Sequence, residues 1–557
     1  MAAQKLRQIR SRPSLQMKFC PLCKQTFKDD NVNFCRQDGT PLVIESWSQS
    51  DTQQLLGKVQ PGIGGSIHSQ KQGVSNIPTT SATLTQTRRP RKSKTIDSLA
   101  VLPFVNVSQD PGTDYLSEGI TESIINSLSP LPKLRVMARS TVFRYRDRAV
   151  DPSEVGKALG VRAVVSGRVN HFGDRLMINT ELVDVSDGSQ LWGQQYNLAF
   201  ADIFEVQEEI AREISEMLRM KLTGAEKKQL VKRYTENSKA YQLYLKGRFF
   251  WAKRTPESLK KGIDCFQQAI DVDPDYALAY VGIADCYIHR GGGASIGLRP
   301  SEGMAKAKVA TQRALSLDDT LAEAHTSLAY VKLLYDWDWQ ASEKEYQRAI
   351  ELNPKYTEAH HSYSHYLTAM GRSEESLAES LRSLELEPLD LLMNVHLAWH
   401  YLMAREPDLA VTQLHKTLEL EANSFQAHLY LGQAYEFMKL YEDAVVELQR
   451  AKGLSEASTE ALAALGHAYA TLGRREDAQS ILNRFEQLSR EVYVSPYLIA
   501  TVHLGLEEKD KAFESLEKAF VERDQWMIYL KVDPIFDTLR TESHYAELVK
   551  RVGLTNN

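Results

Sequence analysis

Cysteine is scarce in this sequence, and its placement excludes a framework of disulfides. Only five of the 557 residues are cysteine, and Cys20, Cys23 and Cys35 fall within sixteen positions. Cys265 and Cys286 occur singly, in stretches with helical periodicity. Small secreted scaffolds instead carry paired, closely spaced cysteines. The pattern predicts one metal site and two buried thiols in a reducing compartment.

Long apolar runs are also missing. No stretch of about 18 apolar residues occurs, so we expect no membrane-spanning helix. Residues 1–17 are basic but lack the apolar core that a secretory signal contains. The expected location is therefore the cytoplasm.

Signature motifs of common enzymes are absent as well. The sequence has no glycine-rich kinase loop followed by a VAIK-type lysine, and neither HRD nor DFG occurs. No segment combines a nucleophile, a base and a phosphate-binding loop. We therefore expect that the chain is not an enzyme and has no kinase, cyclase or protease activity of its own.

Charge is unevenly distributed along the chain. Residues 1–95 carry 15 Lys or Arg against 5 Asp or Glu, whereas the remainder carries 52 against 67. This asymmetry indicates a basic arm on an acidic body. The run RRPRKSK at 88–94 could contact phosphates or an acidic partner, but a solvated charge run is the favoured interpretation.

Changes in composition predict several domains, as the length of the chain requires. The expected fold class is multi-domain and mainly α, with an α-solenoid preceded by a small α/β domain and a zinc-ribbon-like knuckle. In chain order we expect a basic tail (1–18), a zinc-ribbon-like unit (19–44), a disordered linker rich in Ser, Thr, Gln and Gly (45–95), an α/β domain (97–224), a repeat array (238–520) and a C-terminal cap (521–557).

The α/β domain is expected from alternating strand and helix patterns. Apolar runs at 99–105 and 134–139 predict strands, and apolar spacing of three and four at 114–129 predicts a helix. A second helix is expected at 151–160, begun by Asp151 and ended by Gly160. Residues 161–197 read as three strands joined by the turns HFGD and SDGS, and 201–222 reads as an amphipathic helix.

Taken together, AVLPFVNVSQDPG, LGVRAVVSGRV, LVDVSDGSQLW and DIFEVQEEIA resemble the TolB amino-terminal/FlgO-type domain of bacterial proteins. The resemblance covers roughly 97–224. Relatives often join this domain to tetratricopeptide repeats and to a kinase, cyclase or winged-helix module. We find no sequence motif of a kinase, cyclase or winged-helix module here.

From about residue 238 the sequence repeats every 34 residues. Small residues recur at two positions of the repeat. One series is Ser376, Ala410, Ala444, Ala478 and Ala512, and the other is Ser364, Ala398, Gly432, Gly466 and Ala500. Prolines close several units, at Pro274, Pro354 and Pro388. This pattern is that of the tetratricopeptide repeat (TPR), in which two antiparallel helices approach closely where side chains are small, and about eight units fit.

The three clustered cysteines predict a metal site. Cys20-x2-Cys23-x11-Cys35-x2-Asp38 has the spacing of a zinc ribbon, with a carboxylate as an unusual fourth ligand. A unit of 26 residues buries too little surface to fold unaided, which favours structural Zn²⁺ over a metal-free ribbon.

Other candidate residues have simpler interpretations. His361 and His365 are spaced to share a metal, but His360 and His428 fall at the large-aromatic position of the repeat, so packing is favoured for this group. Asp114 is expected to cap a helix rather than bind a ligand. The run YDWDW at 335–339 predicts a cluster at a repeat junction.

Three functions remain open. The favoured one is a non-catalytic scaffold or adaptor in bacterial signalling or regulation, binding proteins or peptides on the concave TPR surface. The second is a transcription-linked regulator that contacts DNA through the ribbon and basic linker, although no recognition helix is legible. The third is an activator in trans of a kinase or nucleotide cyclase. Any nucleic-acid binding is expected to be non-specific.

Overall fold

The protein is described from a computed structural model in which the chain forms two compact units, Met1–Arg91 and Lys92–Asn557. Residues described in the second unit are 96–108, 111–129, 131, 133–146, 151–218, 222–224, 233–292, 298–456 and 458–555. In the first unit only the backbone of three short strands is described.

Those strands form a small antiparallel sheet in the order β2-β1-β3. They are β1 (Lys18–Phe19), β2 (Thr26–Phe27) and β3 (Val43–Ile44). Phe19 pairs with both Thr26 and Val43. The predicted ligands Cys20, Cys23, Cys35 and Asp38 and the basic run 88–94 lie outside the described residues.

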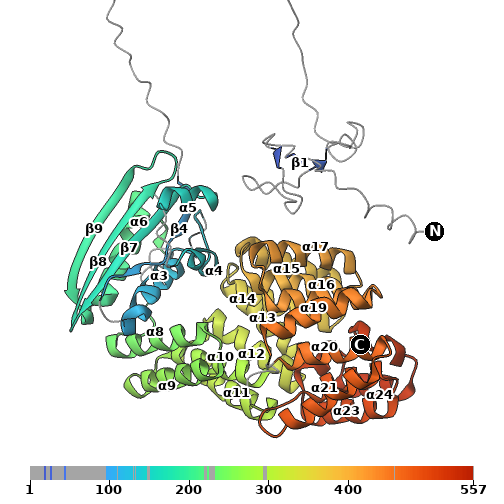
Figure 1. Ribbon diagram of the computed structural model, residues 1–557. Helices are drawn as coiled ribbons and strands as arrows, with labels where there is room; N and C mark the ends of the chain where they lie inside the picture. Colours follow the sequence, from blue (N-terminus) through green and yellow to red (C-terminus); the bar gives the residue numbers. More distant parts are fainter. Residues whose placement is uncertain are drawn as a thin grey trace, which may run out of the picture. The chain divides into compact units, whose positions relative to one another are not determined.

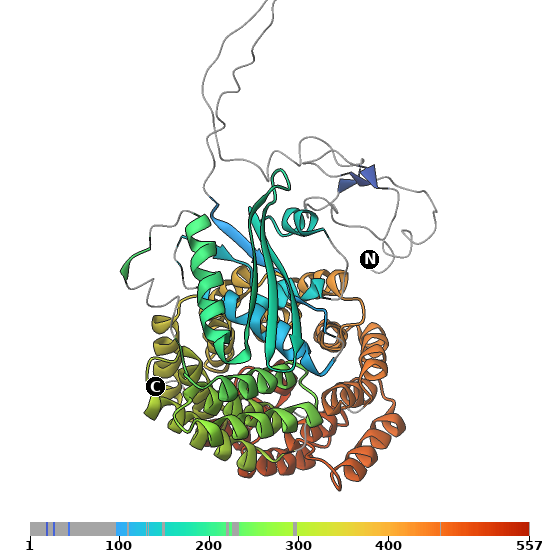
Figure 2. The same cartoon turned by 90° about the vertical axis from the view of Figure 1, so that its left-hand side faces the viewer.

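A mixed sheet organises residues 98–199. Its strands are β4 (Ser98–Val101), β5 (Val105–Asn106), β6 (Arg135–Val136), β7 (Ala163–Phe172), β8 (Arg175–Asp184) and β9 (Gln190–Ala199). The order is β6-β4-β7-β8-β9, with β5 also paired to β7. Strand β4 pairs with β7 in parallel, whereas β7, β8 and β9 form an antiparallel meander (Figure 2).

The meander confirms the three strands expected from the sequence. Its turns need a left-handed residue, and Gly173 and Gly188 supply one with φ of 60° and 71°. The strand expected at 99–105 is divided, because Pro103 has no N–H to donate to the ladder. The strand expected at 134–139 is only two residues long and leads into the short helix α4 (Arg139–Val142).

Three longer helices cover the sheet: α3 (Asp114–Leu128), α5 (Pro152–Ala158) and α6 (Ile203–Met217). Asp151 caps α5 as expected, accepting hydrogen bonds from the N–H groups of Ser153 and Glu154. The expectation for Asp114 was wrong. Thr113 is the N-cap of α3, and Asp114, the first helical residue, accepts a hydrogen bond of 2.7 Å from Asn106 instead.

The solenoid follows as eight antiparallel helix pairs within the described residues (Figure 1). The pairs are α8 (Ser238–Ala252) with α9 (Pro256–Val272), α10 (Ala277–Gly292) with α11 (Pro300–Leu317), α12 (Ala322–Val331) with α13 (Trp339–Leu352), α14 (Thr357–Ala369) with α15 (Ser373–Leu386), α16 (Leu391–Met403) with α17 (Pro407–Leu420), α18 (Phe425–Phe437) with α19 (Tyr441–Leu454), α20 (Thr459–Thr471) with α21 (Arg475–Leu488), and α22 (Pro496–Gly505) with α23 (Lys509–Val521). None of the described helices is long and apolar enough to cross a membrane.

Small residues allow the helices of each pair to approach. Every member of the two 34-residue series that the sequence shows is buried or glycine inside a packed helix. A Cβ atom at Gly432 would lie 2.5 Å from Leu448 Cγ, and one at Gly466 would lie 3.2 Å from Ile481 Cγ2, in each case on the second helix of the pair. The spacing of the helices therefore depends on residue size at these positions.

A third 34-residue series appears only in the backbone. A residue in the turn after the first helix of a pair adopts a left-handed conformation in six successive pairs. These residues and their φ angles are Trp337 (56°), Gly371 (76°), Arg405 (70°), Lys439 (61°), Gly473 (77°) and Glu507 (62°). Four of the six are not glycine, so the tight turn between the helices is made at some conformational cost.

Helix α8 belongs to both cores of this unit. Tyr241 and Leu245 are buried in the core of the α/β domain, while Ala240 and Leu243 pack with the solenoid. A Cβ atom at Gly119 of α3 would lie only 2.7 Å from Leu245 Cδ1. The α/β domain and the first repeat therefore pack as one body.

The segment after the last pair returns to the middle of the solenoid. It contains the 3₁₀ helices η5 (Gln525–Tyr529) and η6 (Pro534–Leu539) and helix α24 (Ser543–Val552). Lys531 Nζ donates to Met370 O at 3.2 Å, and Arg405 pairs with Asp537 at 2.8 Å. The segment predicted as a terminal cap thus also contacts repeats more than 100 positions earlier in the chain.

Candidate interaction groove

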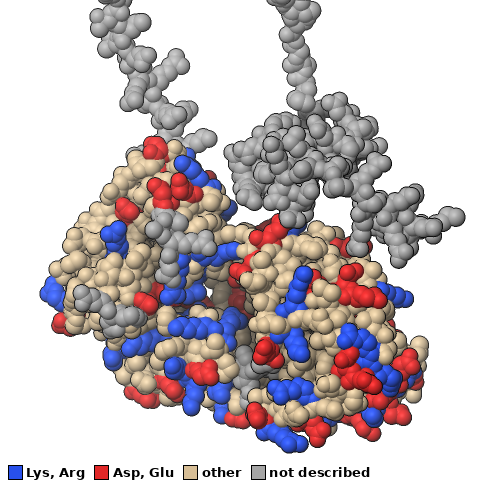
Figure 3. Space-filling view, viewed as in Figure 1, with Lys and Arg blue, Asp and Glu red and all other residues tan. Residues whose placement is uncertain are grey.

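The concave side of the solenoid encloses a groove of about 2110 Å³. Its wall comes mostly from the first helix of each pair, from α8 to α22, together with η5 and η6. Residues Asp97, Glu122 and 133–140 of the α/β domain line one part of it. Figure 3 shows the molecule hollowed near its centre, with Lys and Arg side chains beside the opening.

The wall combines aromatic and charged side chains. The aromatic members include Trp251, Tyr330, Trp399, Tyr430 and Trp526. Carboxylates and guanidinium groups lie between them, such as Glu358, Arg382 and Arg475. Aromatic rings supply large contact areas at low entropic cost, and charges set orientation. The groove wall therefore combines the kinds of side chain that contact polypeptides at protein interfaces.

A buried ion network joins the α/β domain to the first repeat at the groove edge. Glu122 lies 3.0 Å from both Arg248 of α8 and Arg139 of α4. Burial opposes ionisation of Glu122, but the two guanidinium groups outweigh it and hold the pKa of this carboxyl below its usual value. Burial raises the pKa of the neighbouring Glu118, despite its ion pair of 2.5 Å with Arg146.

Side chains also tie the α/β domain to the middle repeats. Lys355 Nζ donates to Ser129 O and Leu131 O, both at 2.9 Å, beyond the C-terminus of α3, where a cation is favoured. Arg144 donates to Leu420 O at 3.0 Å. Ser140 hydrogen-bonds to Glu387, whose pKa is raised to about 7 because the carboxyl is buried. The α/β domain is therefore fixed against the repeats at several points.

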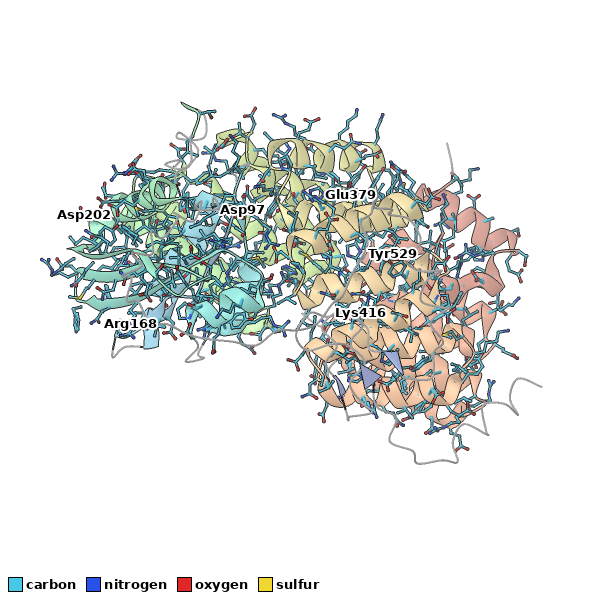
Figure 4. All side chains as sticks on the ribbon, turned by 90° about the horizontal axis from the view of Figure 1, so that it is seen from above. Asp97, Arg168, Asp202, Glu379, Lys416 and Tyr529 are labelled. Atoms are coloured by element: carbon cyan, nitrogen blue, oxygen red, sulfur yellow. The ribbon has the colours of Figure 1, made fainter. Side chains whose placement is uncertain are left out.

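Histidines at one position of the repeat have a structural role. His360 Nδ1 lies 2.6 Å from Glu379 Oε2, and its Nε2 lies 3.0 Å from Pro354 O (Glu379 on α15 is labelled in Figure 4). His428 makes the same two contacts with Glu447 and Ala422 O, at 2.6 and 3.0 Å. The pattern recurs at His325 with Glu345 and Asp319, and at Asn394 with Gln413 and Pro388. These side chains join the two helices of a pair to the preceding loop by hydrogen bonds as well as by packing.

Four other histidines form a cluster, and three of them, His361, His365 and His396, line the groove. His361 and His365 lie on α14, and His396 and His400 lie on α16. The imidazoles of His361 and His396 are stacked with centroids 4.9 Å apart. Sequence reasoning found the first pair but missed the second. The missed signal was the same spacing of four on two successive first helices.

The predicted junction cluster at 335–339 is confirmed. Trp337 is buried, with its ring centroid 5.3 Å from that of Phe520, and the Arg523 guanidinium lies 4.0 Å above the ring. The two free cysteines described, Cys265 and Cys286, lie on α9 and α10. Burial raises the pKa of both thiols, which disfavours the reactive thiolate.

Two protein-family models match parts of the chain. A model described as the second domain of HilA/YgeH-like transcriptional regulators matches residues 93–217, and a tetratricopeptide-repeat model matches 459–491, which spans α20 and α21. The pair α20 and α21 therefore matches a tetratricopeptide repeat, and the chain is a TPR-repeat protein. The first match falls on the segment compared with the TolB/FlgO-type domain, and that resemblance stays a prediction.

Curated relatives align with about half of the chain. “Putative adenylate cyclase 3” of Rhizobium meliloti is 32% identical over 253 residues, covering 45% of this chain and 42% of that protein. The transcriptional regulator HilA of Salmonella typhimurium is 22% identical over 314 residues, covering 56% of this chain and 54% of HilA. The chain thus spans about half the length of the curated relatives it matches. Among solved structures, PilF of Pseudomonas aeruginosa is 21% identical, with a TM-score of 0.31 over 39% of this chain and 92% of that one.

Proposed function

We propose that this chain is a non-catalytic scaffold or adaptor in bacterial signalling or regulation, which binds a peptide or partner domain in the TPR groove. The observation that carries the proposal is the continuous groove of about 2110 Å³ on the concave face, lined by aromatic and charged side chains from successive repeats. Stacked TPR helices form extended concave surfaces of this kind, and such surfaces bind polypeptides.

Affinity capture with the untruncated chain tests this function. Phe437→Glu and Arg382→Glu alter the groove wall, whereas Val446→Glu places the same charge on the outer face, where Val446 is 47% exposed. We expect both groove variants to lose partners that the native chain and the Val446→Glu control retain, as identified by mass spectrometry. Identical partner sets for all four proteins would contradict groove binding.

A transcription-linked regulator is the second candidate. The match of residues 93–217 to a domain of HilA/YgeH-like regulators favours it. If the basic arm alone contacts DNA, binding will be weak, insensitive to sequence and steeply salt-dependent, because phosphate contacts dominate it. A sequence-specific complex that survives physiological salt, measured by fluorescence anisotropy, would place this function above the scaffold.

Activation of a cyclase in trans is the third candidate, favoured by the alignment with a protein named as an adenylate cyclase. We expect no nucleotide turnover by the purified chain itself. Nucleotide turnover that co-purifies with the protein, and that is lost in a chain without residues 97–224, would contradict the non-catalytic proposal.

We also propose that the N-terminal unit binds structural Zn²⁺ through Cys20, Cys23, Cys35 and Asp38. The antiparallel pairing of Phe19 with Thr26, which flank the Cys-x2-Cys segment, supports the hairpin that a ribbon needs. Cys35→Ser should abolish zinc binding, and Asp38→Cys should tighten it, because a thiolate replaces an oxygen. Full affinity in Asp38→Ala, by competition with a chelating dye, would exclude Asp38 as a ligand.

A further inference from the structure

Three imidazole nitrogens converge where α14 faces α16 in the groove wall. His396 Nδ1 lies 2.7 Å from His361 Nε2 and 2.9 Å from His365 Nε2. All three nitrogens lie within 4.8 Å of one another. His361 is buried and the other two histidines are half-buried, and all three line the groove.

We propose that His361, His365 and His396 form a binding site for a divalent transition-metal ion, of which Zn²⁺ is the best candidate. Imidazole is a preferred ligand of Zn²⁺, Co²⁺, Ni²⁺ and Cu²⁺. A tetrahedral ion bonded at 2.0–2.1 Å separates its nitrogen ligands by about 3.3 Å. The two short contacts would widen by about half an ångström, and the third pair of nitrogens, which lies within 4.8 Å, would close by up to about 1.5 Å.

The hydrogen-bonding capacity of the rings supports this site. A neutral imidazole has one N–H and one lone pair, so His396 Nδ1 can form one good hydrogen bond along its ring plane. It nevertheless lies close to two imidazole nitrogens. Whichever tautomers are chosen, either one contact opposes like groups (two lone pairs or two N–H groups), or the single N–H or lone pair of His396 Nδ1 must serve both contacts. A cation at the centre accepts all three lone pairs and removes this conflict.

A metal also explains the environment of the other nitrogen of His361. His361 Nδ1 is buried without a hydrogen-bond partner and lies 3.7 Å from Glu358 Oε1. When Nε2 binds a metal, Nδ1 carries the proton and faces this carboxylate, which is the usual way in which a ligand histidine is oriented.

His365 has an equivalent outer contact. Its Nδ1 lies 3.2 Å from both His400 Nε2 and Tyr529 Oη, and His400 Nδ1 lies 2.6 Å from Ser380 Oγ. These groups can accept a hydrogen bond from Nδ1–H of His365. Such a bond would hold the imidazole ring in a fixed orientation relative to α15 and η5 (Tyr529 is labelled in Figure 4).

Three protein ligands leave one position of a tetrahedral ion open. Because the three histidines line the groove, this position faces the space in which a partner is proposed to bind. Water, or a carboxylate or imidazole of a bound peptide, can occupy it. The metal would also join α14 to α16 and, through Tyr529, the middle repeats to the C-terminal segment.

The test uses the untagged full chain with Cys20, Cys23 and Cys35 replaced by serine as the background protein. These replacements remove the proposed N-terminal zinc site, so metal binding by the histidines can be measured alone. We expect this background to bind one Co²⁺ per chain, with visible ligand-field bands and no thiolate charge-transfer band. His361→Asn/His396→Asn should weaken Co²⁺ and Zn²⁺ binding at least 100-fold. His415→Asn, which alters an exposed histidine on α17, is the matched control and should bind normally.

Stability measurements keep the test decisive if a variant folds poorly. Zn²⁺ should raise the melting midpoint of the background and of His415→Asn, but not that of the double variant or of His396→Gln alone. Failure of the background to bind Co²⁺, or equal affinity in the double variant, would overturn the proposal. Neither result depends on whether the groove captures a partner.

Discussion

The middle and the C-terminal repeats have the same geometry but different interiors. At equivalent positions, α14 and α15 place Ser364 and Ser376, whereas α20 and α21 place Gly466 and Ala478. Ser376 Oγ donates to Ser364 O at 2.9 Å and lies 2.6 Å from the Thr368 hydroxyl. The three atoms nearest to a Cβ added at Gly466 are instead aliphatic carbons of Val502 and Ile481.

This difference shows that the repeat constrains the size of the side chains at these positions but not their polarity. Small side chains of either kind allow the helices to approach. Buried hydroxyls and imidazoles in the middle repeats need partners that aliphatic groups do not, so their polar interior costs free energy unless it is fully satisfied. The polar region is also where the histidine cluster lies and where Lys355 and Glu387 contact the α/β domain, which is why we place the proposed metal site there.

The largest expected effect comes from enlarging a small residue of the C-terminal repeats. Gly466→Leu should reduce the free energy of unfolding by about 1–3 kcal/mol, because the side chain would overlap Val502 and Ile481. Ala444→Leu should behave similarly. Gly453→Leu is the control, since nothing lies within 4 Å of its Cβ position. Circular dichroism melts measure the effect, and unchanged midpoints for both test variants would contradict the assigned repeat register.

In the middle repeats, the buried carboxyl of Glu387 should make stability depend on pH. Its pKa of about 7 lies above that of an unfolded glutamate, so the folded state favours the protonated form. Stability is then fully present below about pH 4.5 and falls as the pH rises to about 7. Glu387→Gln, which can keep the bond to Ser140, should raise stability by about 1–2 kcal/mol at pH 8 and change it little at pH 4.5.

The exposed neighbour Glu385 provides the control for that experiment. Glu385→Gln should leave urea unfolding unchanged at both pH values. An equal gain for Glu387→Gln at pH 4.5 and pH 8 would mean that the carboxyl charge is not the cause.

Within the middle repeats, two neighbouring helix pairs differ in the polar pair that joins their helices. Asn394 with Gln413 fills the place that His360 with Glu379 fills one repeat earlier. The double change His360→Asn/Glu379→Gln should therefore cost less than the sum of the two single changes, with a coupling of about 1 kcal/mol. A double-mutant cycle measured by urea unfolding checks this, and strictly additive losses would show that the pairs are independent.

The smallest expected effects concern the left-handed turns that both regions share. Gly473→Ala should destabilise the chain by about 1 kcal/mol, through φ alone, because no atom lies within 4 Å of the added Cβ. Lys439→Gly, at the equivalent exposed position, should stabilise by about 0.5 kcal/mol, since strain relief is partly offset by unfolded-state entropy. Thermal melts of the two variants should shift in opposite directions.

Much of the fold was predictable from local patterns. The meander at 163–199 follows from period-two alternation and the turn glycines Gly173 and Gly188, and the cap at Asp151 follows from residue type. The helix pairs follow from the 34-residue series of small residues. Each of these signals acts over a few residues or within one repeat, where backbone preference and side-chain size decide the outcome.

The binding surfaces depend on contacts that no local pattern contains. His361 contacts His396 across 35 positions, and Tyr529 reaches His365 across 164. Helix α8 enters the core of the α/β domain because Gly119 admits Leu245. The sequence by itself determined the repeat and its period. Tertiary structure decided which repeats meet, because small rotations between successive pairs add up along the solenoid until its end returns to its middle.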